Sequence, residues 1–411
     1  MIEWSEQHLM LRDAMRRFVE DEIKPRVEEL EHGDTPPYDV LRKLFKTFGI
    51  DQINLARYQH RLAKKKNGAA EPETDEEGGE RPGSGDGAAM QLIPIIEICR
   101  YSPGMVTALG VSVGLTSSAI MSKGTAAQME RWVPPILTLE KIGAWAITEP
   151  GSGSDAFGSM KSTAKRKGDG YLLNGQKTFI TNGPYADTIV FICKLDDGSD
   201  PKDRRVLHFV LDRGMPGLTQ SKPLRKMGMH SSPTGELFLE DVYVEKDRLL
   251  GETEDSGSGG RAGAKATFGQ ERTGVVAMAL GIIERCLELS VDYARTRVQF
   301  GRPIGEFQLI QDKIARMEVA RMNLQNIVFR IVELSANGKG MTFAEASACK
   351  LYSARAAMEV ALEAVQVFGG NGYMAEFHVE QLCRDAKVLQ IYAGTDEIQI
   401  SQIARDLLSR A

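Results

Sequence analysis

A short run near the end of the printed sequence combines small residues with acidic ones. Ala393, Gly394 and Thr395 interrupt a helical pattern of apolar residues, and Asp396 and Glu397 follow directly. Thr395 is a good N-cap residue and the two acidic residues suit a first helical turn, so the run predicts that a new helix begins here. A helix N-terminus beside small residues lets a bulky ligand approach the exposed backbone N–H groups.

A loop rich in glycine and serine lies at residues 149–155. It reads Glu149-Pro150-Gly151-Ser152-Gly153-Ser154-Asp155 and offers several N–H and hydroxyl donors to a ligand. Many loops of this composition only turn corners, so the loop alone is a weak indication of binding.

A basic run lies at residues 295–304. Such a run is usually a solvated face of the protein. Here, however, Gly301 and Pro303 end a helix, and the forked guanidinium groups of the run suit bidentate binding of a phosphate.

Length and composition describe a large and mildly acidic globular protein. The 411 residues are enough for two or three packed units, and the net charge of −5 does not favour a nucleic acid or a membrane surface as partner. We see no apolar run that approaches the roughly 18 residues of a membrane span. The first residues resemble neither a secretory signal nor a transit leader.

The cysteines have no spacing typical of metal ligands. We therefore expect no metal site, free thiols that are mostly buried, and a reducing cytoplasmic location. The five are Cys99, Cys193, Cys286, Cys349 and Cys383.

The first part of the chain, to about residue 140, has amphipathic helical patterns. Within it, residues 64–87 are almost free of apolar side chains and cannot support a core, so we expect a solvated or mobile loop inserted between helices. A segment that binds a partner or covers a pocket is the alternative interpretation of this insert.

The pattern then becomes that of strands and later of helices again. Short β-rich runs occur from about 143 to 250, and Asn174-Gly175 predicts a tight hairpin turn between two of them. The Gly- and Ser-rich residues 251–265 predict a linker. Long helical patterns from 267 to 411, including a helix beginning near Phe268, predict a helical bundle.

Three motifs near the end of the chain resemble a known family. Gly369-Gly370-Asn371-Gly372-Tyr373, Arg384-Asp385 and Ile391-Tyr392-Ala393-Gly394-Thr395 resemble the C-terminal signature of the FAD-dependent acyl-CoA dehydrogenases. The resemblance covers nearly the whole chain except the acidic insert. It implies an α+β fold with an N-terminal helical domain at 1–140, a middle antiparallel β domain at 141–262 and a C-terminal four-helix bundle at 263–411.

The resemblance also implies one side of an FAD site in the middle domain. The motif around the Gly/Ser loop would place Trp145 and Thr148 against the flavin, with Thr148 bonding the ring edge and Ser154 near the pantetheine or the FAD phosphates. A second motif would place Phe179 on the ring face and Thr181 near N5. Without the family, Phe179 would be interpreted as a core aromatic residue on a strand.

Other FAD contacts implied by the resemblance come from a neighbouring subunit. The basic run and the glycine motif would supply these contacts across a dimer, and the family is typically a homotetramer built as a dimer of dimers. The residues are Arg297, Phe300, Gln308, Gln366, Gly369 and Gly370. Thr395 and Glu397 also match residues beside the dinucleotide.

One departure from the family concerns the catalytic base. Many members carry a Glu where this chain has Ala393. In a subset that includes isovaleryl-CoA and long-chain acyl-CoA dehydrogenases, the base instead precedes an Arg on an earlier helix, as Glu271 precedes Arg272 here. Taken alone, Glu271 would be a first-turn carboxylate that favours the helix dipole. Together with Ala393, it is a candidate for a base with a raised pKa.

The implied reaction is the oxidation of an acyl-CoA thioester to the trans-2-enoyl-CoA. Glu271 would take the α proton while the β hydride passes to flavin N5, and an electron-transfer flavoprotein would accept the electrons. The N–H of Ala393, with a flavin hydroxyl, would bind the thioester oxygen. Ser154, Arg272 and Gly394 are the other candidate substrate contacts.

Two other interpretations stay open. The chain could be a non-catalytic structural subunit of a hetero-oligomer, because it lacks the C-terminal Glu. It could also be a family relative that oxidises another carbon acid or reacts with oxygen, since fold does not fix chemistry. The sequence does not identify the acyl group.

Overall fold

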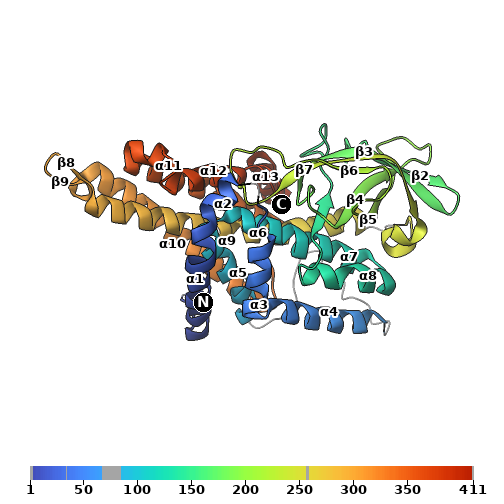
Figure 1. The fold of residues 1–411 in the computed structure, drawn as a ribbon, viewed down its shortest axis with the longest axis horizontal. Coiled ribbons are helices and arrows are strands. Elements are labelled where there is room, and N and C mark those ends of the chain that lie inside the picture. The colour runs from blue at the N-terminus through green and yellow to red at the C-terminus, as the bar shows by residue number, and fades with distance from the viewer. Residues whose placement is uncertain (1–2, 34, 67–84, 256–258, 410–411) are drawn as a thin grey trace.

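The computed structural model describes residues 3–33, 35–66, 85–255 and 259–409, with only the course of the backbone at 85–86 and 259–270. Figure 1 shows a helical region, a sheet at one end and a long helical arm at the other. The predicted α+β fold class is confirmed, with helices first, a β unit in the middle and helices last.

The N-terminal region is helical, as predicted. Its first helix begins at a capping box, in which the Ser5 hydroxyl accepts from the His8 N–H at 3.3 Å. Another helix ends at Gly49, whose φ of 63° favours glycine. The α-helices are α1 (Glu6–Phe18), α2 (Val27–His32), α3 (Tyr38–Phe48), α4 (Ile50–Lys66), α5 (Gly85–Cys99), α6 (Pro103–Leu109), α7 (Ser117–Lys123) and α8 (Ala126–Leu137).

The predicted loop at 64–87 is shorter in the structure at both ends. Residues 64–66 complete α4 and residues 85–87 begin α5. The remaining part of this prediction, residues 67–84, lies outside the described residues. The polar composition of residues 64–66 does not prevent a helix, because Lys is a good helix former and suits a last turn.

Pro103–Lys123 is a continuous helical segment made of α6, the π-helical η3 (Gly110–Thr116) and α7. By length and composition alone it could cross a membrane, so the expectation that no such run exists is wrong. Its polar groups are nevertheless bonded within the protein. Ser112 Oγ accepts from the Gly143 N–H at 2.9 Å, and Asn182 Nδ2 donates to the Ala108 carbonyl at 2.9 Å. These bonds join the segment to the β unit.

The middle region forms a seven-stranded sheet with the order β1-β4-β2-β3-β7-β6, and β5 pairs with β4. Most pairs are antiparallel, but β1 and β2 each run parallel to β4, so the prediction of a wholly antiparallel unit is wrong in this detail. Long stretches of chain separate β1 and β2 from β4, and two parallel strands need such a long connection. The strands are β1 (Gly143–Ala146), β2 (Thr163–Lys167), β3 (Gly170–Thr181), β4 (Thr188–Leu195), β5 (Val206–Asp212), β6 (Leu218–Gln220) and β7 (Thr234–Glu245).

The hairpin predicted at Asn174-Gly175 is wrong. Both residues lie inside the continuous strand β3, at a register shift against β7. Gly175 is needed there because a Cβ would lie 2.2 Å from the Ser162 hydroxyl. The tight turn comes earlier, at Gly168 and Asp169, where β2 meets β3 and Gly168 has a φ of 56°.

The C-terminal region is a helical bundle with a small two-stranded hairpin, β8 (Val298–Gln299) and β9 (Arg302–Pro303). Its first helix begins at Gly259, so the predicted helix start near Phe268 is wrong and the predicted linker at 251–265 is wrong for residues 259–265. Residues 251–255 do connect the β unit to this helix, and residues 256–258 lie outside the described residues. The helices are α9 (Gly259–Thr296), α10 (Gln308–Ala336), α11 (Phe343–Phe368), α12 (Val379–Val388) and α13 (Asp396–Ser409). At 1.5 Å per residue the 38 residues of α9 span about 57 Å.

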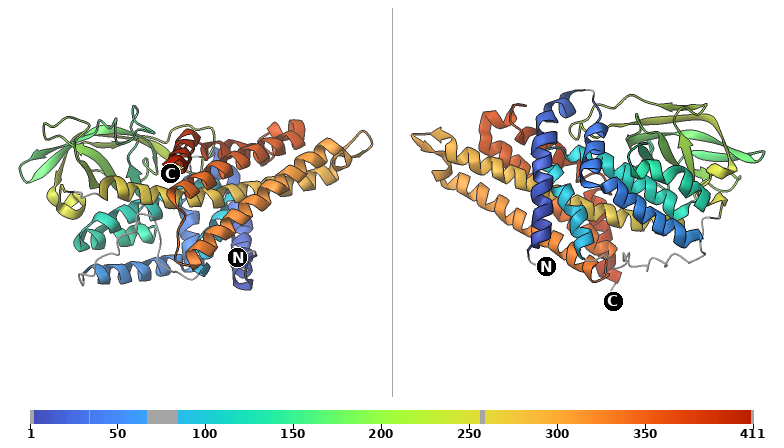
Figure 2. Two further views of the ribbon diagram at one scale, coloured as in Figure 1. Left: turned by 180° about the vertical axis from the view of Figure 1, so that it is seen from behind. Right: turned by 60° about the horizontal axis from the view of Figure 1, so that its bottom comes forward.

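One hydrophobic core joins the two helical regions. It includes Leu41 and Ile93 from the N-terminal helices together with Ile283 and Val360 from α9 and α11. The sheet has its own core, centred on residues such as Phe191 and Phe209. Figures 1 and 2 show α9 passing from the sheet, across this shared core, to the tip of the arm that carries β8 and β9.

Candidate functional site

Glu271 lies inside α9, about three turns after its first residue. The interpretation of Glu271 as a first-turn carboxylate is therefore wrong. Its neighbour Arg272 is buried and lies beside the loop that precedes α13, since a Cβ at Gly394 would be 3.6 Å from Arg272 Nη2. The structure thus brings together the Glu271-Arg272 pair and the Ala393-Gly394 pair, which are more than 120 residues apart in sequence.

Burial controls the charge of Glu271. It raises the pKa of this carboxyl to about 7, and the positive charges of Arg272 and Lys350 oppose the rise. Arg272 donates to the Ser347 hydroxyl at 2.9 Å and lies over the Phe343 ring at 3.9 Å. Burial lowers the Arg272 pKa to about 10, which still leaves it charged at neutral pH.

The loop before α13 has the conformation that its small residues predict. Ala393 has a φ of 53° and Gly394 a φ of 87°, and α13 then begins at Asp396. The Thr395 hydroxyl accepts from the Ile398 N–H at 3.4 Å, so the predicted N-cap and fresh helix start are confirmed. Glu397 lies exposed in the first turn of α13.

The carbonyl and N–H groups of this loop face different surroundings. The carbonyl oxygens of Ala393, Gly394 and Thr395 all accept hydrogen bonds from the protein. Among the residues that the structure describes, the three N–H groups of this loop have no acceptor. The loop therefore presents unused donors, which suits a ligand oxygen.

Two residues that the sequence analysis missed hold this loop. Lys350 of α11 is fully buried and its Nζ donates to the Gly394 carbonyl at 2.8 Å. Gln399 of α13 is fully buried and its Nε2 donates to the carbonyls of Ala393 and Gly394 at 3.0 and 2.8 Å. A Lys in an otherwise apolar helical stretch was the available signal for Lys350.

The predicted flavin-facing residues lie on the sheet and its loops. Trp145 is half-buried on β1, and the Thr148 carbonyl accepts from the Thr178 N–H at 2.9 Å. Thr181 is half-buried at the end of β3, and Ser154 is exposed in the Gly/Ser turn. The bond from Thr178 shows that the Gly/Ser loop and the second flavin motif are neighbours.

Phe179 is not a core aromatic residue. Its side chain is 69% exposed and its φ is 57°, an uncommon backbone conformation for a bulky residue. A register shift between Lys177 and Ile180 turns the ring out of the strand pattern. An exposed aromatic ring on a strained backbone is typical of a ligand-contacting residue.

A buried ion pair supports this pair of loops. Lys177 of β3 is fully buried, and its Nζ donates to Glu149 Oε1 and to the Ile147 carbonyl, each at 2.9 Å. Glu149 also accepts from the backbone N–H groups of Lys161 and Ser162. Burial would raise the Glu149 pKa, but Lys177 and these donors hold it below its usual value.

A second group of predicted residues lies far away, at the end of the arm. Phe300 is 95% exposed with a φ of 52°, at the tip of the β8–β9 hairpin beside Arg297. Gln308 begins α10 next to this hairpin and is exposed. The tip is about 37 Å from Glu271, measured along α9 from residue 271 to residue 296.

The glycine motif lies toward the same end of the bundle. Phe368 at the end of α11 stacks on Tyr293 near the end of α9, with ring centroids 4.1 Å apart. Gln366 is exposed, and a Cβ at Gly369 or Gly370 would meet no atom within 4 Å. Within one chain, the residues predicted to bind one FAD therefore form two separate groups, one near Glu271 and one near the arm.

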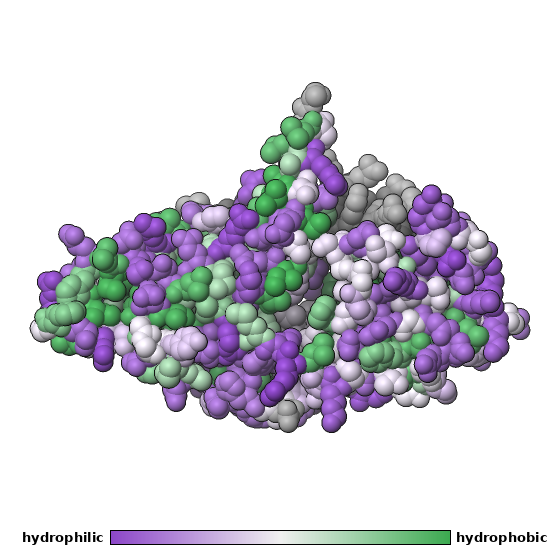
Figure 3. All heavy atoms as spheres, turned by 90° about the horizontal axis from the view of Figure 1, so that it is seen from above, coloured by the Kyte–Doolittle hydropathy of each residue, from purple (hydrophilic) through white to green (hydrophobic). Residues whose placement is uncertain are grey.

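The arm also carries exposed apolar side chains. Figure 3 shows hydrophobic surface along the arm, to the left in that view. The exposed residues of its helices and hairpin include Val298, Leu309, Val319, Met322, Leu362 and Tyr373. Clusters of such residues are typical of a surface that is covered by another chain.

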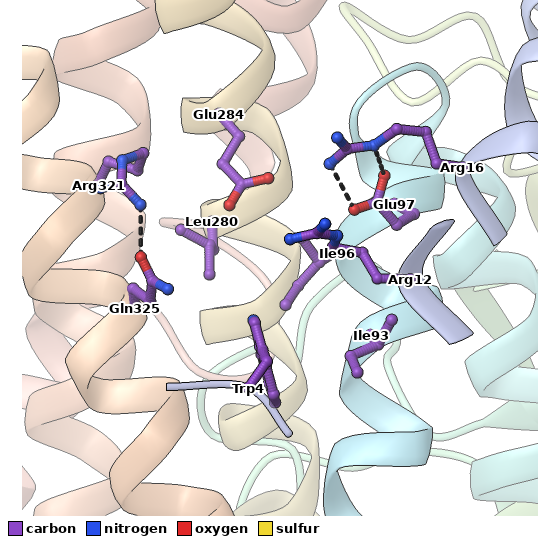
Figure 4. Close-up of a pocket in the computed structure, with 10 residues that line it drawn as sticks. All are labelled: Trp4, Arg12, Arg16, Ile93, Ile96, Glu97, Leu280, Glu284, Arg321 and Gln325. Carbon is purple, nitrogen blue, oxygen red and sulfur yellow. Dashed lines mark hydrogen bonds and ion pairs between the residues drawn. The ribbon is translucent and has the colours of Figure 1, made fainter. Parts of the chain in front are cut away.

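A further cavity, between α1, α5, α9 and α10, is distinct from this site (Figure 4). Its charged side chains are largely paired with other protein groups. Arg16 makes a two-point contact with Glu97 at 2.9 Å, and Arg321 donates to Gln325. None of the site residues predicted from the sequence lines this cavity. Its paired charges indicate that these side chains link the helices to one another.

Comparison with known sequences agrees with this arrangement. Sequence models of the acyl-CoA dehydrogenase N-terminal, middle and C-terminal domains match residues 5–58 and 60–140, 144–242, and 258–408. The chain belongs to the acyl-CoA dehydrogenase family. Named members of this family are oxidoreductases that act on CH–CH bonds and depend on FAD.

Individual relatives match over nearly their whole length. The chain is 36% identical to an acyl-CoA dehydrogenase of Bacillus subtilis over 98% of both chains. It is 34% identical to a mitochondrial isovaleryl-CoA dehydrogenase of Arabidopsis thaliana, over 98% of this chain and 92% of that one. Among solved structures, butyryl-CoA dehydrogenase of Megasphaera elsdenii superimposes with a TM-score of 0.83 at 31% identity, covering 99% and 100% of the two chains.

The residues present fit FAD. The exposed ring of Phe179 and the half-buried Trp145 offer apolar faces to a flavin, and the unused N–H groups of residues 393–395 offer donors. The open space beside Gly369 and Gly370 lets a large ligand reach the backbone. The group near Glu271 thus offers surfaces for a ring and for hydrogen-bond acceptors, and the separate group near the arm offers open backbone for a dinucleotide.

Proposed function

We propose that this acyl-CoA dehydrogenase oxidises an acyl-CoA thioester to the trans-2-enoyl-CoA with Glu271 as the catalytic base. The observation that carries the proposal is the buried carboxyl of Glu271, which feels the charges of Arg272 and Lys350, two residues that both reach Gly394. A base must approach the proton it removes, and a carboxyl with a pKa of about 7 is ionised often enough to act at neutral pH. The small side chain of Ala393 leaves room beside the loop.

Each residue has a distinct part in the proposed reaction. FAD, when bound, supplies the acceptor of the hydride. The Glu271 carboxylate takes the α proton and holds it after the C–H bond breaks. The Ala393 N–H donates to the thioester oxygen and stabilises the negative charge that develops there. Arg272 stays charged beside Glu271 and favours its ionised form.

A spectroscopic titration tests this function. The purified protein is followed anaerobically by its flavin absorbance while butyryl-CoA, isovaleryl-CoA, palmitoyl-CoA and 3-phenylpropionyl-CoA are added in turn. We expect a yellow protein that bleaches with one acyl class. The Glu271→Gln variant should bind FAD and acyl-CoA but bleach at least about 1000-fold more slowly, because an amide cannot take the proton.

The control is Glu240→Gln, which removes an exposed carboxyl from β7. This variant should bleach at the wild-type rate. Unchanged bleaching in Glu271→Gln would refute the assignment of the base. A protein that takes up no flavin even when FAD is added would favour the non-catalytic subunit, and rapid oxidation of the reduced protein by oxygen would favour the oxygen-reacting relatives.

We also propose a homotetramer in which paired chains complete each other's FAD sites. The distance of about 37 Å between Glu271 and the tip of the arm supports it, because both groups match contacts to one cofactor. Arg297, Phe300, Gln308 and the Gln366–Gly370 segment would then act in the site of the partner subunit. The exposed apolar surface of the arm supports such an assembly.

Three finer points are also proposals. We propose an electron-transfer flavoprotein as the electron acceptor, on family grounds. We propose a cytoplasmic location, supported by the five free cysteines. We propose domain limits at 1–140, 141–262 and 263–411, supported by the change from helices to strands at residue 143 and back to helices after residue 252.

A further inference from the structure

We infer that Lys350, with Gln399, is a positioning residue that holds the 393–395 loop so that its N–H groups face the substrate and the cofactor. The inference rests on the proposed role of Glu271 and deepens it. Neither Lys350 nor Gln399 belongs to the flavin and substrate motifs. Both side chains are fully buried, and both end at the carbonyl groups of this loop.

The peptide planes of the loop determine where its N–H groups point. In a planar trans peptide, the C=O of one residue points opposite to the N–H of the next. Gln399 Nε2 holds the Ala393 and Gly394 carbonyls at 3.0 and 2.8 Å, and Lys350 Nζ holds the Gly394 carbonyl at 2.8 Å. The N–H groups of Gly394 and Thr395 must therefore point to the opposite side of the loop. Because the peptide plane after Ala393 is held, the φ of 53° at Ala393 then fixes the direction of the Ala393 N–H as well.

The third carbonyl completes the pattern. The Thr395 carbonyl accepts from the Gln399 N–H at 3.0 Å as the first bond of α13. All three carbonyls of the loop are thus held by the protein, whereas its three N–H groups have no acceptor within the described part of the chain. Gln399 holds these carbonyls with its side-chain amide and its backbone N–H, and Lys350 holds one of them with its charged ammonium group.

Strain in the loop explains why such holding is needed. Ala393 adopts a φ of 53°, which is unfavourable for a residue with a Cβ, and Gly394 follows with a φ of 87°. An unsupported loop would relax toward ordinary backbone angles and rotate its donors away. Two buried donors on two helices, α11 and α13, prevent this relaxation.

Lys350 is not explained as an ordinary salt bridge. Its Nζ lies 3.9 Å from Asp396 Oδ1, which is too long for a hydrogen bond. Asp396 is instead held by Arg355, whose Nε donates to Oδ2 at 3.0 Å. The short contact of Lys350 is the one to the Gly394 carbonyl.

The charge of Lys350 adds a second effect. Around Glu271, the charged and titratable neighbours are Arg272 from the same helix, Lys350 from α11 and Tyr392 from the loop before α13. Lys350 itself also faces the carboxylates of Asp396 and Glu397. Removal of the ammonium should leave Glu271 harder to ionise, because the positive charge of Lys350 favours the ionised form of Glu271.

The test compares three variants with the FAD-bound wild-type enzyme. Lys350→Met and Gln399→Met each remove one holder of the loop. Arg355→Met is the matched control, because it removes a cation that bonds Asp396 from the same helix α11 but does not touch the loop carbonyls. The substrate is whichever acyl-CoA of the panel bleaches the wild-type fastest, and kcat, KM and the pH profile are measured.

We expect Lys350→Met and Gln399→Met to lower kcat by about tenfold or more with little change in KM, as expected when a donor to the developing charge is misplaced. Only Lys350→Met should also move the acid limb of the pH profile to higher pH, by roughly 0.5–1 pH unit. Arg355→Met should change neither. Lys350→Arg should keep the acid limb in place while recovering only part of kcat.

Several outcomes would overturn the inference. Wild-type kcat and pH profile in Lys350→Met would do so, and so would an equal effect of Arg355→Met, which would assign the change to Asp396. If Lys350→Met does not fold with FAD, Gln399→Met and Lys350→Arg take its place. An unchanged kcat in Gln399→Met, together with a shifted acid limb in Lys350→Arg, would then refute the inference. Glu271→Gln measured in parallel separates the two proposals: if it remains active, the assignment of the base fails independently of Lys350.

Discussion

The pH dependence of the reaction is the most direct consequence of the environment of Glu271. Its carboxyl has lost most of its contact with water, so its pKa rises from 4.5 to about 7. A rise of about 2.5 units corresponds to about 3.4 kcal/mol against the charged form, and this is an upper bound because the side chain keeps some accessible surface. The base is therefore half-ionised near neutral pH.

The expected size of the effect follows from the titration curve. With a pKa of about 7, the ionised fraction is about 9% at pH 6 and about 91% at pH 8, so kcat/KM should rise about tenfold. With an ordinary carboxyl pKa of about 4.5, the ionised fraction would change by only about 3% over this range. Arg272, with a pKa of about 10, stays charged throughout.

The assay is the anaerobic rate of flavin bleaching at low acyl-CoA concentration, measured from pH 5.5 to pH 8.5 at constant ionic strength. This rate reports kcat/KM and hence the pKa of the free enzyme. The flavin spectrum is used to check that FAD stays bound at every pH in this range. A profile that stays flat between pH 6 and pH 8 would refute the assignment of the buried Glu271 carboxyl as the base.

Three more predictions concern assembly and stability. If sites are shared across a dimer, random mixing of Arg297→Met and Glu271→Gln chains should restore about 25% of wild-type activity, since half the dimers then contain one intact site; no recovery would contradict sharing. Burial, and then the nearby Asp385, raise the pKa of Glu31 to about 8, so its contribution to stability is present below about pH 4.5 and is lost as the pH rises through 8. Glu31→Gln should thus stabilise the protein at pH 8.5 by roughly 2 kcal/mol in chemical denaturation, and little at pH 4.5. Glu97→Gln should destabilise it by roughly 2 kcal/mol in the same assay, because it breaks the ion pair between the buried Glu97 of α5 and the partly exposed Arg16 of α1 and weakens the contact of Glu97 with the buried Arg100.

Local sequence signals predicted the loop and helix start at residues 393–396 well. The small residues, the N-cap residue and the acidic residues of the first turn lie within a few positions of one another, so the local sequence alone determines where this helix begins. The alternation of strand and helix patterns likewise predicted the order of the three regions. These features depend on short-range physics.

The errors arose where distant contacts override local preference. Asn174-Gly175 has the composition of a hairpin, but the close approach of Ser162 requires a glycine within a continuous strand. The Gly-rich residues 259–265 form the first two turns of α9 in spite of a low helical propensity. Gln399 could not be found by sequence reasoning, because its only distinguishing feature is what it bonds in the folded chain. Lys350 had a signal in its apolar helical surroundings, but that signal does not identify the Gly394 carbonyl as its partner.

The helix α9 gives the fold its functional geometry. It carries Glu271 near one end and leads into the β8–β9 hairpin at the other, so a single rigid element fixes the distance between a chain's own base and the residues it would lend to its partner. Because a helix of this length cannot shorten without breaking hydrogen bonds, that distance of about 37 Å is set by residue count alone. In the proposed dimer, each of the two sites would depend on the length of α9 in both chains. Substitutions that bend α9 would then disturb the base and the cofactor contacts together.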